Sequence, residues 1–283
     1  MLKEQLTNIK SMDAMQMKRM NSHEIEELLK KMTINIGSVD PELRDTLIYR
    51  TFDKLIMLDI LSDAQMTDLL KTCMGGHHLF LKIGTANDDA VFTRSFSSLV
   101  IALILVKDKS RRFLTDEILR QVFEKINLYM REEEDTRGYV IDKGWAHSIA
   151  HGADLLAAAV SHSFYSSEWA NEFIETVHMC LFKRGCYINE EDERLIFIID
   201  ELTAKGLSEQ ELESWVVKIF KELEVYRETH GYSLEFFQLK TNVLNFAKTL
   251  YFRLGNQQVY KDAKNQITIN INSWHKKIYL NPV

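Results

Sequence analysis

Proline and glycine, the residues that most often interrupt helices, are scarce in this chain. The 283 residues include two prolines, Pro41 and Pro282, and 11 glycines. Proline removes a backbone N–H and clashes with the preceding helical turn, while glycine loses more backbone entropy than other residues when it is held in a helix. Hydrophobic residues make up 46% of the sequence, which is ordinary for a globular protein. The composition therefore favours a mostly helical chain with a sizeable core.

Paired cysteines, long apolar runs and basic stripes are also lacking. Cys73, Cys180 and Cys186 have no zinc-like spacing, so we interpret them as thiols in a reducing cytosol. The longest apolar run, Leu99–Val106, is far shorter than the roughly 20 residues of a membrane span, and the N-terminal segment carries charges throughout. The formal net charge is −6, and basic pairs are flanked by acids. We expect a soluble, cytoplasmic chain whose main partner is neither a nucleic acid nor a membrane.

Apolar residues recur at helical spacing along most of the chain, and capping residues precede several of these stripes. Thr115 is expected to cap one helix, and Ser208 and Glu211 form a capping box ahead of another. The apolar segments Leu99–Val106 and Phe236–Phe252 are predicted to be interior helices. The isoleucines of the C-terminal tail fit a strand or a helix, and we choose a helix because no partner strand is evident.

These patterns predict an all-α protein of about eleven or twelve helices, each roughly 12–22 residues long. Short turns between the helices suggest stacked helical hairpins. No consensus repeats at a fixed period, so the predicted fold is a degenerate α-solenoid similar to HEAT or armadillo arrays. No shift in composition marks a boundary, and residues 1–283 are predicted to form a single domain. Residues 1–20 are expected to be a loosely docked leading helix.

Polar residues and glycines are concentrated in one stretch, Asp135–Leu156. A helix predicted from about Gly144 to His162 would place His147, His151 and Asp154 within about 60° of one another, opposite an apolar face. Residues from the preceding loop would fold back towards this polar face. The predicted pocket consists of Asp135, Arg137, Tyr139, Trp145, His147, His151 and Asp154.

One interpretation of this stretch is a metal site. The helix would supply two ligands to one ion, either His147 with His151 or His151 with Asp154, and imidazole ligands favour a divalent transition metal. His147 and Asp154 are separated by about 10.5 Å of helical rise, too far to meet at one ion. A third ligand would have to come from elsewhere, for example Glu134 or Asp135. The stretch also lacks the glutamate of the HExxH pattern.

Two other interpretations remain open. The histidines would serve as general acids or bases, because a carboxylate one helical turn away fixes the tautomer of an imidazole. Arg137 would then bind an anion. Alternatively, these groups only satisfy one another, with Asp135 bonded to Arg137 in the loop and His151 bonded to Asp154 along the helix.

The same stretch resembles a bacterial family of all-helical domains of unknown function. The matching pattern is Asp135-x-Arg137-Gly138-Tyr139 followed by Gly144-Trp145-x-His147-x-x-Ala150-His151-x-x-Asp154. Weaker similarity extends to Arg94-Ser95-Phe96, Glu191-Asp192-x-Arg194 and Leu250-Tyr251-Phe252. The resemblance implies one helical domain built around this motif, and it implies no reaction.

Two functions are consistent with these observations, and whether the chain is an enzyme stays open. The first is a binding module that presents a concave polar pocket to a protein or peptide. The second is an enzyme or small-ligand receptor, with or without a metal, that uses His147, His151 and Asp154 together with Asp135 and Arg137. Burial distinguishes them, because a scaffold hides such groups in hydrogen bonds and a pocket leaves a histidine reachable.

Overall fold

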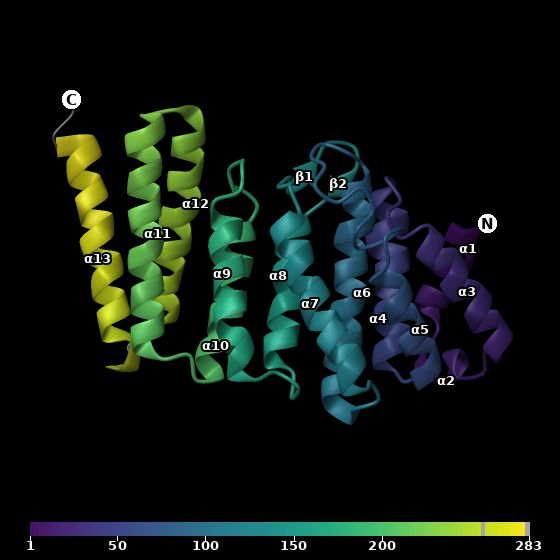
Figure 1. Cartoon of the computed structure of the whole chain (residues 1–283). Coiled ribbons are helices and arrows are strands. Elements are labelled where there is room, and N and C mark those ends of the chain that lie inside the picture. Colours follow the sequence, from purple (N-terminus) through teal and green to yellow (C-terminus); the bar gives the residue numbers. More distant parts are fainter. Residues whose placement is uncertain (256–257, 281–283) are drawn as a thin grey trace. The chain divides into compact units, whose positions relative to one another are not determined.

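The computed structural model describes residues 1–255 and 258–280. It contains two compact units, unit 1 (Met1–Tyr165) and unit 2 (Ser166–Val283). Within the described residues the elements are helices, apart from two short strands in unit 1 (Figure 1). The all-α prediction is therefore confirmed. The single domain over residues 1–283 and the solenoid stacking stay predictions.

Unit 1 is built around one apolar helix. Its elements are α1 (Leu2–Ser11), α2 (Ala14–Met17), α3 (Ser22–Ile34), the π-helix η1 (Glu42–Tyr49), α4 (Arg50–Met57), α5 (Asp63–Cys73), α6 (Ala90–Arg111), α7 (Asp116–Glu132), β1 (Tyr139–Val140), β2 (Gly144–Trp145) and α8 (Ser148–Ser161). Helix α6 packs against α4, α5 and α8, and α8 also packs against α7. Thr115 caps α7 as predicted, its hydroxyl accepting the Ile118 N–H.

Helix α6 is apolar enough to resemble a membrane span. Among the described helices it alone has the length and composition for one, with a mean hydropathy of 1.7, but 83% of that apolar window is buried inside the protein. The core helix of a globular unit has the same composition. The predicted interior position of Leu99–Val106 needs one correction, because Leu103 is only half-buried and Val106 is exposed. Even this helix keeps one face towards solvent.

The leading segment contributes three side chains to the core of unit 1. Helices α1 and α2 bury Leu6, Ile9 and Met17 completely or nearly so. Helix α1 lies against η1 and α4. The Lys54 ammonium donates to the Lys10 carbonyl at 2.7 Å, which ties α4 to the end of α1. Leu6, Ile9 and Met17 are thus part of the core of unit 1, whereas most other residues of segment 1–20 are exposed.

Unit 2 consists of helices that pack on one another. Its elements are η2 (Ser167–Trp169), α9 (Ala170–Leu181), α10 (Glu191–Ala204), α11 (Glu209–His230), α12 (Leu234–Arg253), η3 (Gln258–Tyr260), α13 (Lys261–His275) and η4 (Lys276–Leu280). Helix α11 packs against α12 and α13, and α10 packs against α9 and α12. The Ser208–Glu211 capping box is present at the start of α11, and the tail forms the predicted helix. Helix α12 is less interior than predicted, since Phe237 and Phe252 are exposed.

Candidate functional site

The focal stretch folds as a hairpin before its helix begins. Strand β1 pairs antiparallel with β2, so that Tyr139 lies opposite Trp145. The Ala146 N–H donates to the Gly138 carbonyl at 2.8 Å, and the His147 N–H donates to the Arg137 carbonyl at 3.1 Å. Residues 138–147 form this motif hairpin. Helix α8 begins only at Ser148, and not near Gly144 as predicted.

His147 is therefore not a helical residue. It is the N-cap of α8 and has a left-handed backbone, with φ of +48°. This conformation is uncommon for a residue with a side chain and turns the chain from the hairpin into the helix. The predicted polar helical face is reduced to His151 and Asp154. The predicted apolar face is confirmed, because Ile149 and Leu156 are buried.

A fully buried arginine lies beneath the motif hairpin. The guanidinium of Arg44, on η1, donates to the Lys143 carbonyl at 2.9 Å. It also lies 4.3 Å from the centroid of the Phe92 ring and 4.8 Å from that of Phe96, between two aromatic faces. Burial lowers the pKa of Arg44 from its usual range. This cation fixes the base of the hairpin to η1 and α6.

Gly144 allows the hairpin to come this close to η1. Its φ is +75°, and a side-chain carbon built there would lie 2.8 Å from Cβ of Pro41 and 3.2 Å from the Arg44 guanidinium. Both the left-handed backbone and the contact with Pro41 require glycine. The position of the hairpin is therefore set by its packing against η1. The residues of η1 lie about a hundred positions earlier in the sequence.

Asp135 and Arg137 hold the start of the hairpin, as predicted. The Asp135 carboxylate is buried and accepts from Arg137 Nε at 2.8 Å and from Arg137 Nη2 at 2.6 Å. It also accepts the Asn87 N–H at 2.9 Å, and Arg137 donates to the Asp88 carbonyl at 3.0 Å. The hydrogen bond with Asp135 and the charge of Asp135 raise the pKa of Arg137. The Ser148 hydroxyl donates to the Asp135 carbonyl, which joins the loop to the first turn of α8.

A second buried ion pair supports the same loop and was not predicted. Arg94 on α6 and Glu133 after α7 are both fully buried and form two parallel bonds of 2.6 Å. Arg94 also donates to the Leu81 carbonyl at 3.0 Å. Burial opposes the charge of Arg94, but the hydrogen bond and charge of Glu133 outweigh it and raise its pKa. Glu133 in turn accepts the Asp135 N–H at 2.9 Å.

Aromatic and imidazole rings form a continuous row above these ion pairs. Tyr139 packs edge-to-face on Trp145 with centroids 4.9 Å apart, and Trp145 stacks on His147 at 4.4 Å. His147 contacts His151 edge-to-face at 5.6 Å, and His151 contacts Phe96 at 5.2 Å. Tyr139 is 56% exposed and Trp145 is 40% exposed, whereas both histidines are half-buried. The row thus runs from the surface of the hairpin to the core.

The hydrogen bonds of Ser95 define the tautomer of His151. The Ser95 hydroxyl is buried and donates to the Ala146 carbonyl, which can only accept. Its single proton is used in that bond, so at its 2.8 Å contact with His151 it accepts from Nδ1–H. The neutral His151 ring therefore carries its proton on Nδ1 and its basic lone pair on Nε2. A serine with this bonding is not an activated nucleophile, because the imidazole does not accept its proton.

The two histidines share one environment, but they do not complete a metal site. Within residues 1–255 and 258–280, no three or more His, Cys, Asp or Glu side chains are grouped so as to hold an ion. Asp154 is half-buried on α8, less than one turn after His151. Two imidazoles alone are fewer ligands than the three or four protein ligands of known zinc sites.

Residues 79–252 match the model of a family described as a protein of unknown function, DUF2785. The chain belongs to the DUF2785 family. This confirms the resemblance to a family of unknown function, and the match includes the motif hairpin, α6 and α8. No curated protein and no solved structure matches the chain.

In this DUF2785 chain, sequence reasoning missed several residues that build the site. Arg94, Ser95 and Phe96 were noticed only as a weaker part of the resemblance, yet all three contact the motif or its support. Their adjacency in an apolar helix was a usable signal, because a buried arginine and serine need partners. Arg44 gave no such signal, because the apolar residues around it have the spacing of an ordinary amphipathic helix.

Proposed function

We propose that this DUF2785 protein is a binding module that recognises a protein or peptide partner through the exposed face of its motif hairpin. The observation that carries the proposal is the exposure of Tyr139 and Trp145, side by side on a hairpin whose base is buried. Ile141, at the turn between them, is 80% exposed and extends the apolar face. Tyrosine and tryptophan are enriched at the energetic centres of protein interfaces.

The support beneath the hairpin favours the same function. Three features fix the hairpin backbone: the hydrogen bond from Arg44, the close packing at Gly144 and the Asp135–Arg137 pair. A surface that is already ordered loses little conformational entropy when a partner binds. The stacked His147 ring also backs the Trp145 indole, so that its exposed face is presented in one orientation. The polar residues of the motif thus act mainly as architecture, and the aromatic residues make the contact.

Selection from a random peptide library on the purified full chain tests this proposal. We expect enriched peptides whose binding is lost when Tyr139→Ala and Trp145→Ala are combined. The matched control combines Phe252→Ala with Tyr279→Ala, which removes two aromatic rings exposed to a similar or greater degree in unit 2. Circular dichroism should show the same helical content for both double variants. Peptides that bind the hairpin double variant as tightly as the wild-type chain would refute the proposal.

A small-ligand or catalytic site is the second candidate, and the Ser95–His151 contact favours it. A fixed tautomer with a basic Nε2 is what a general base or a metal ligand requires. Metal analysis of the purified protein, with the His147→Gln, His151→Gln double variant beside it, distinguishes the candidates. The wild-type protein could contain a divalent transition metal that the double variant lacks, while both bind peptide equally. That result would favour a function carried out by the two histidines. Metal content equal in the two proteins would leave the hairpin surface as the better proposal.

A further inference from the structure

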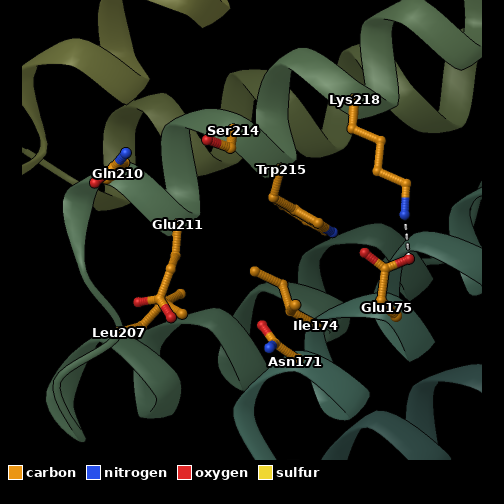
Figure 2. Close-up of a pocket in the computed structure, with 9 residues that line it drawn as sticks. All are labelled: Asn171, Ile174, Glu175, Leu207, Gln210, Glu211, Ser214, Trp215 and Lys218. Atoms are coloured by element: carbon orange, nitrogen blue, oxygen red, sulfur yellow. Dashed lines mark hydrogen bonds and ion pairs between the residues drawn. The ribbon is translucent and has the colours of Figure 1, made fainter.

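A pocket of about 370 Å³ lies between α9 and α11 in unit 2 (Figure 2). Its floor is apolar and consists of Ile174, Leu207 and Trp215, all of which are buried. Its rim is polar and consists of Asn171, Glu175, Gln210, Glu211, Ser214 and Lys218. An apolar floor with a few polar groups at the edge is typical of sites for amphipathic small ligands or single side chains.

The charges of the rim do not cancel. Lys218 pairs with Glu175 across the pocket, as Figure 2 shows, so that these two charges neutralise each other. Among the described residues Glu211 has no cation as a partner, and it accepts the Ser208 N–H at 2.8 Å as part of the capping box. Hydrogen bonds from the Ser208 hydroxyl and N–H lower the pKa of Glu211, so it stays ionised at neutral pH. The rim therefore carries one excess negative charge.

Trp215 gives the floor a buried polar atom as well as a ring. Its side chain is 4% exposed, and its Nε1–H has no hydrogen-bond partner among the described residues. In Figure 2 the indole nitrogen points towards the side of the pocket where Glu175 and Lys218 meet. A buried N–H without an acceptor is destabilising, and its NMR frequency depends on the groups beside it. The NMR signal of the Trp215 indole N–H can therefore be used to detect a ligand in this pocket.

We propose that the pocket binds an ammonium or guanidinium group carried on an aliphatic stem. The stem lies on Trp215 and Ile174, and the cation pairs with Glu211. Anionic ligands are disfavoured because the rim carries one excess negative charge, that of Glu211. This chemistry has two sources, a free alkylamine and the lysine or arginine side chain of a peptide, and both are tested below.

The probe is agmatine, which has an ammonium and a guanidinium on a four-carbon stem, and the comparison compound is pentanoate. Titration of the ¹⁵N-labelled full chain should shift the Trp215 indole N–H signal saturably with agmatine and not with pentanoate. Loss of that signal in Trp215→Phe assigns it. A capped Gly-Arg-Gly peptide forms the second arm. Tighter binding of the peptide than of agmatine identifies a partner's side chain as the source, and the reverse identifies a free amine.

Three variants make the test specific. Glu211→Gln should weaken the binding of agmatine about 2- to 5-fold, the range for an exposed ion pair. The glutamine side chain still completes the capping box. Glu235→Gln removes the same charge from the exposed first turn of α12 and should change nothing. Lys218→Met should tighten binding, because Glu175 then becomes a second carboxylate for the ligand. Equal effects of Glu211→Gln and Glu235→Gln, or no saturable shift with agmatine or the peptide, would overturn the proposal.

Discussion

Replacing Arg94 by methionine removes one half of a fully buried ion pair in unit 1. Glu133 would be left buried without its cation and would lose two hydrogen bonds of 2.6 Å, and the Leu81 carbonyl would lose its donor. Removal of one partner from a buried pair generally costs about 3–5 kcal/mol. For a unit of this size that corresponds to a fall in Tm of roughly 6–20 °C. Because Glu133 also bonds to Asp135, the motif hairpin should loosen too.

Urea denaturation followed by circular dichroism measures the free energy of unfolding. The Arg94→Met, Glu133→Leu double variant is the matched comparison, since it removes both charges and should recover a large part of the lost stability. If Arg94→Met does not fold, Arg94→Lys serves instead, because lysine keeps the charge without the two parallel bonds. An Arg94→Met protein within about 1 kcal/mol of wild type, below the range for a buried pair, would refute the reasoning.

Three further predictions concern the same unit. Gly144→Ala should lower stability by about 1–3 kcal/mol, because it combines a left-handed backbone with the contact to Pro41, and thermal melting would show it; an unchanged Tm would contradict that packing. Arg137→Ala should cost roughly 1–3 kcal/mol in urea denaturation, the range for hydrogen bonds to a charged group. Burial lowers the pKa of His162 despite its 3.0 Å contact with Asp108, so the unfolded chain binds the proton more readily and stability should fall as pH drops from about 7 towards 5. His162→Gln should flatten that dependence, and identical pH profiles for the two proteins would contradict it.

The sequence predicted the helical class and most helix starts because these depend on local signals. Thr115 and Ser208 cap the helices that they precede, and the apolar face of α8 is buried as its spacing requires. The start of α8 was predicted too early for a physical reason. Gly144–Trp145 fit the helical pattern, but hairpin pairing and a left-handed His147 replace the first turn.

The support of the site could not be predicted from local patterns. Arg44 contacts the hairpin across 99 residues of sequence, and Arg94 meets Glu133 across 39. Such contacts depend on tertiary packing between elements far apart in the sequence, which a spacing rule does not describe. The predicted residues Asp135 and Arg137 were recognised because they bond to each other within one loop.

Arg44 supports the hairpin but lies outside the segment that matches the family model. The ends of that segment are therefore not the ends of a folding unit. The matched segment begins at residue 79, whereas Arg44 and Pro41 precede it. A fragment cut at the edges of the match would leave the Phe92 and Phe96 rings without the cation between them and the Lys143 carbonyl without its donor. An expression fragment intended to keep the hairpin in shape must therefore begin upstream of η1.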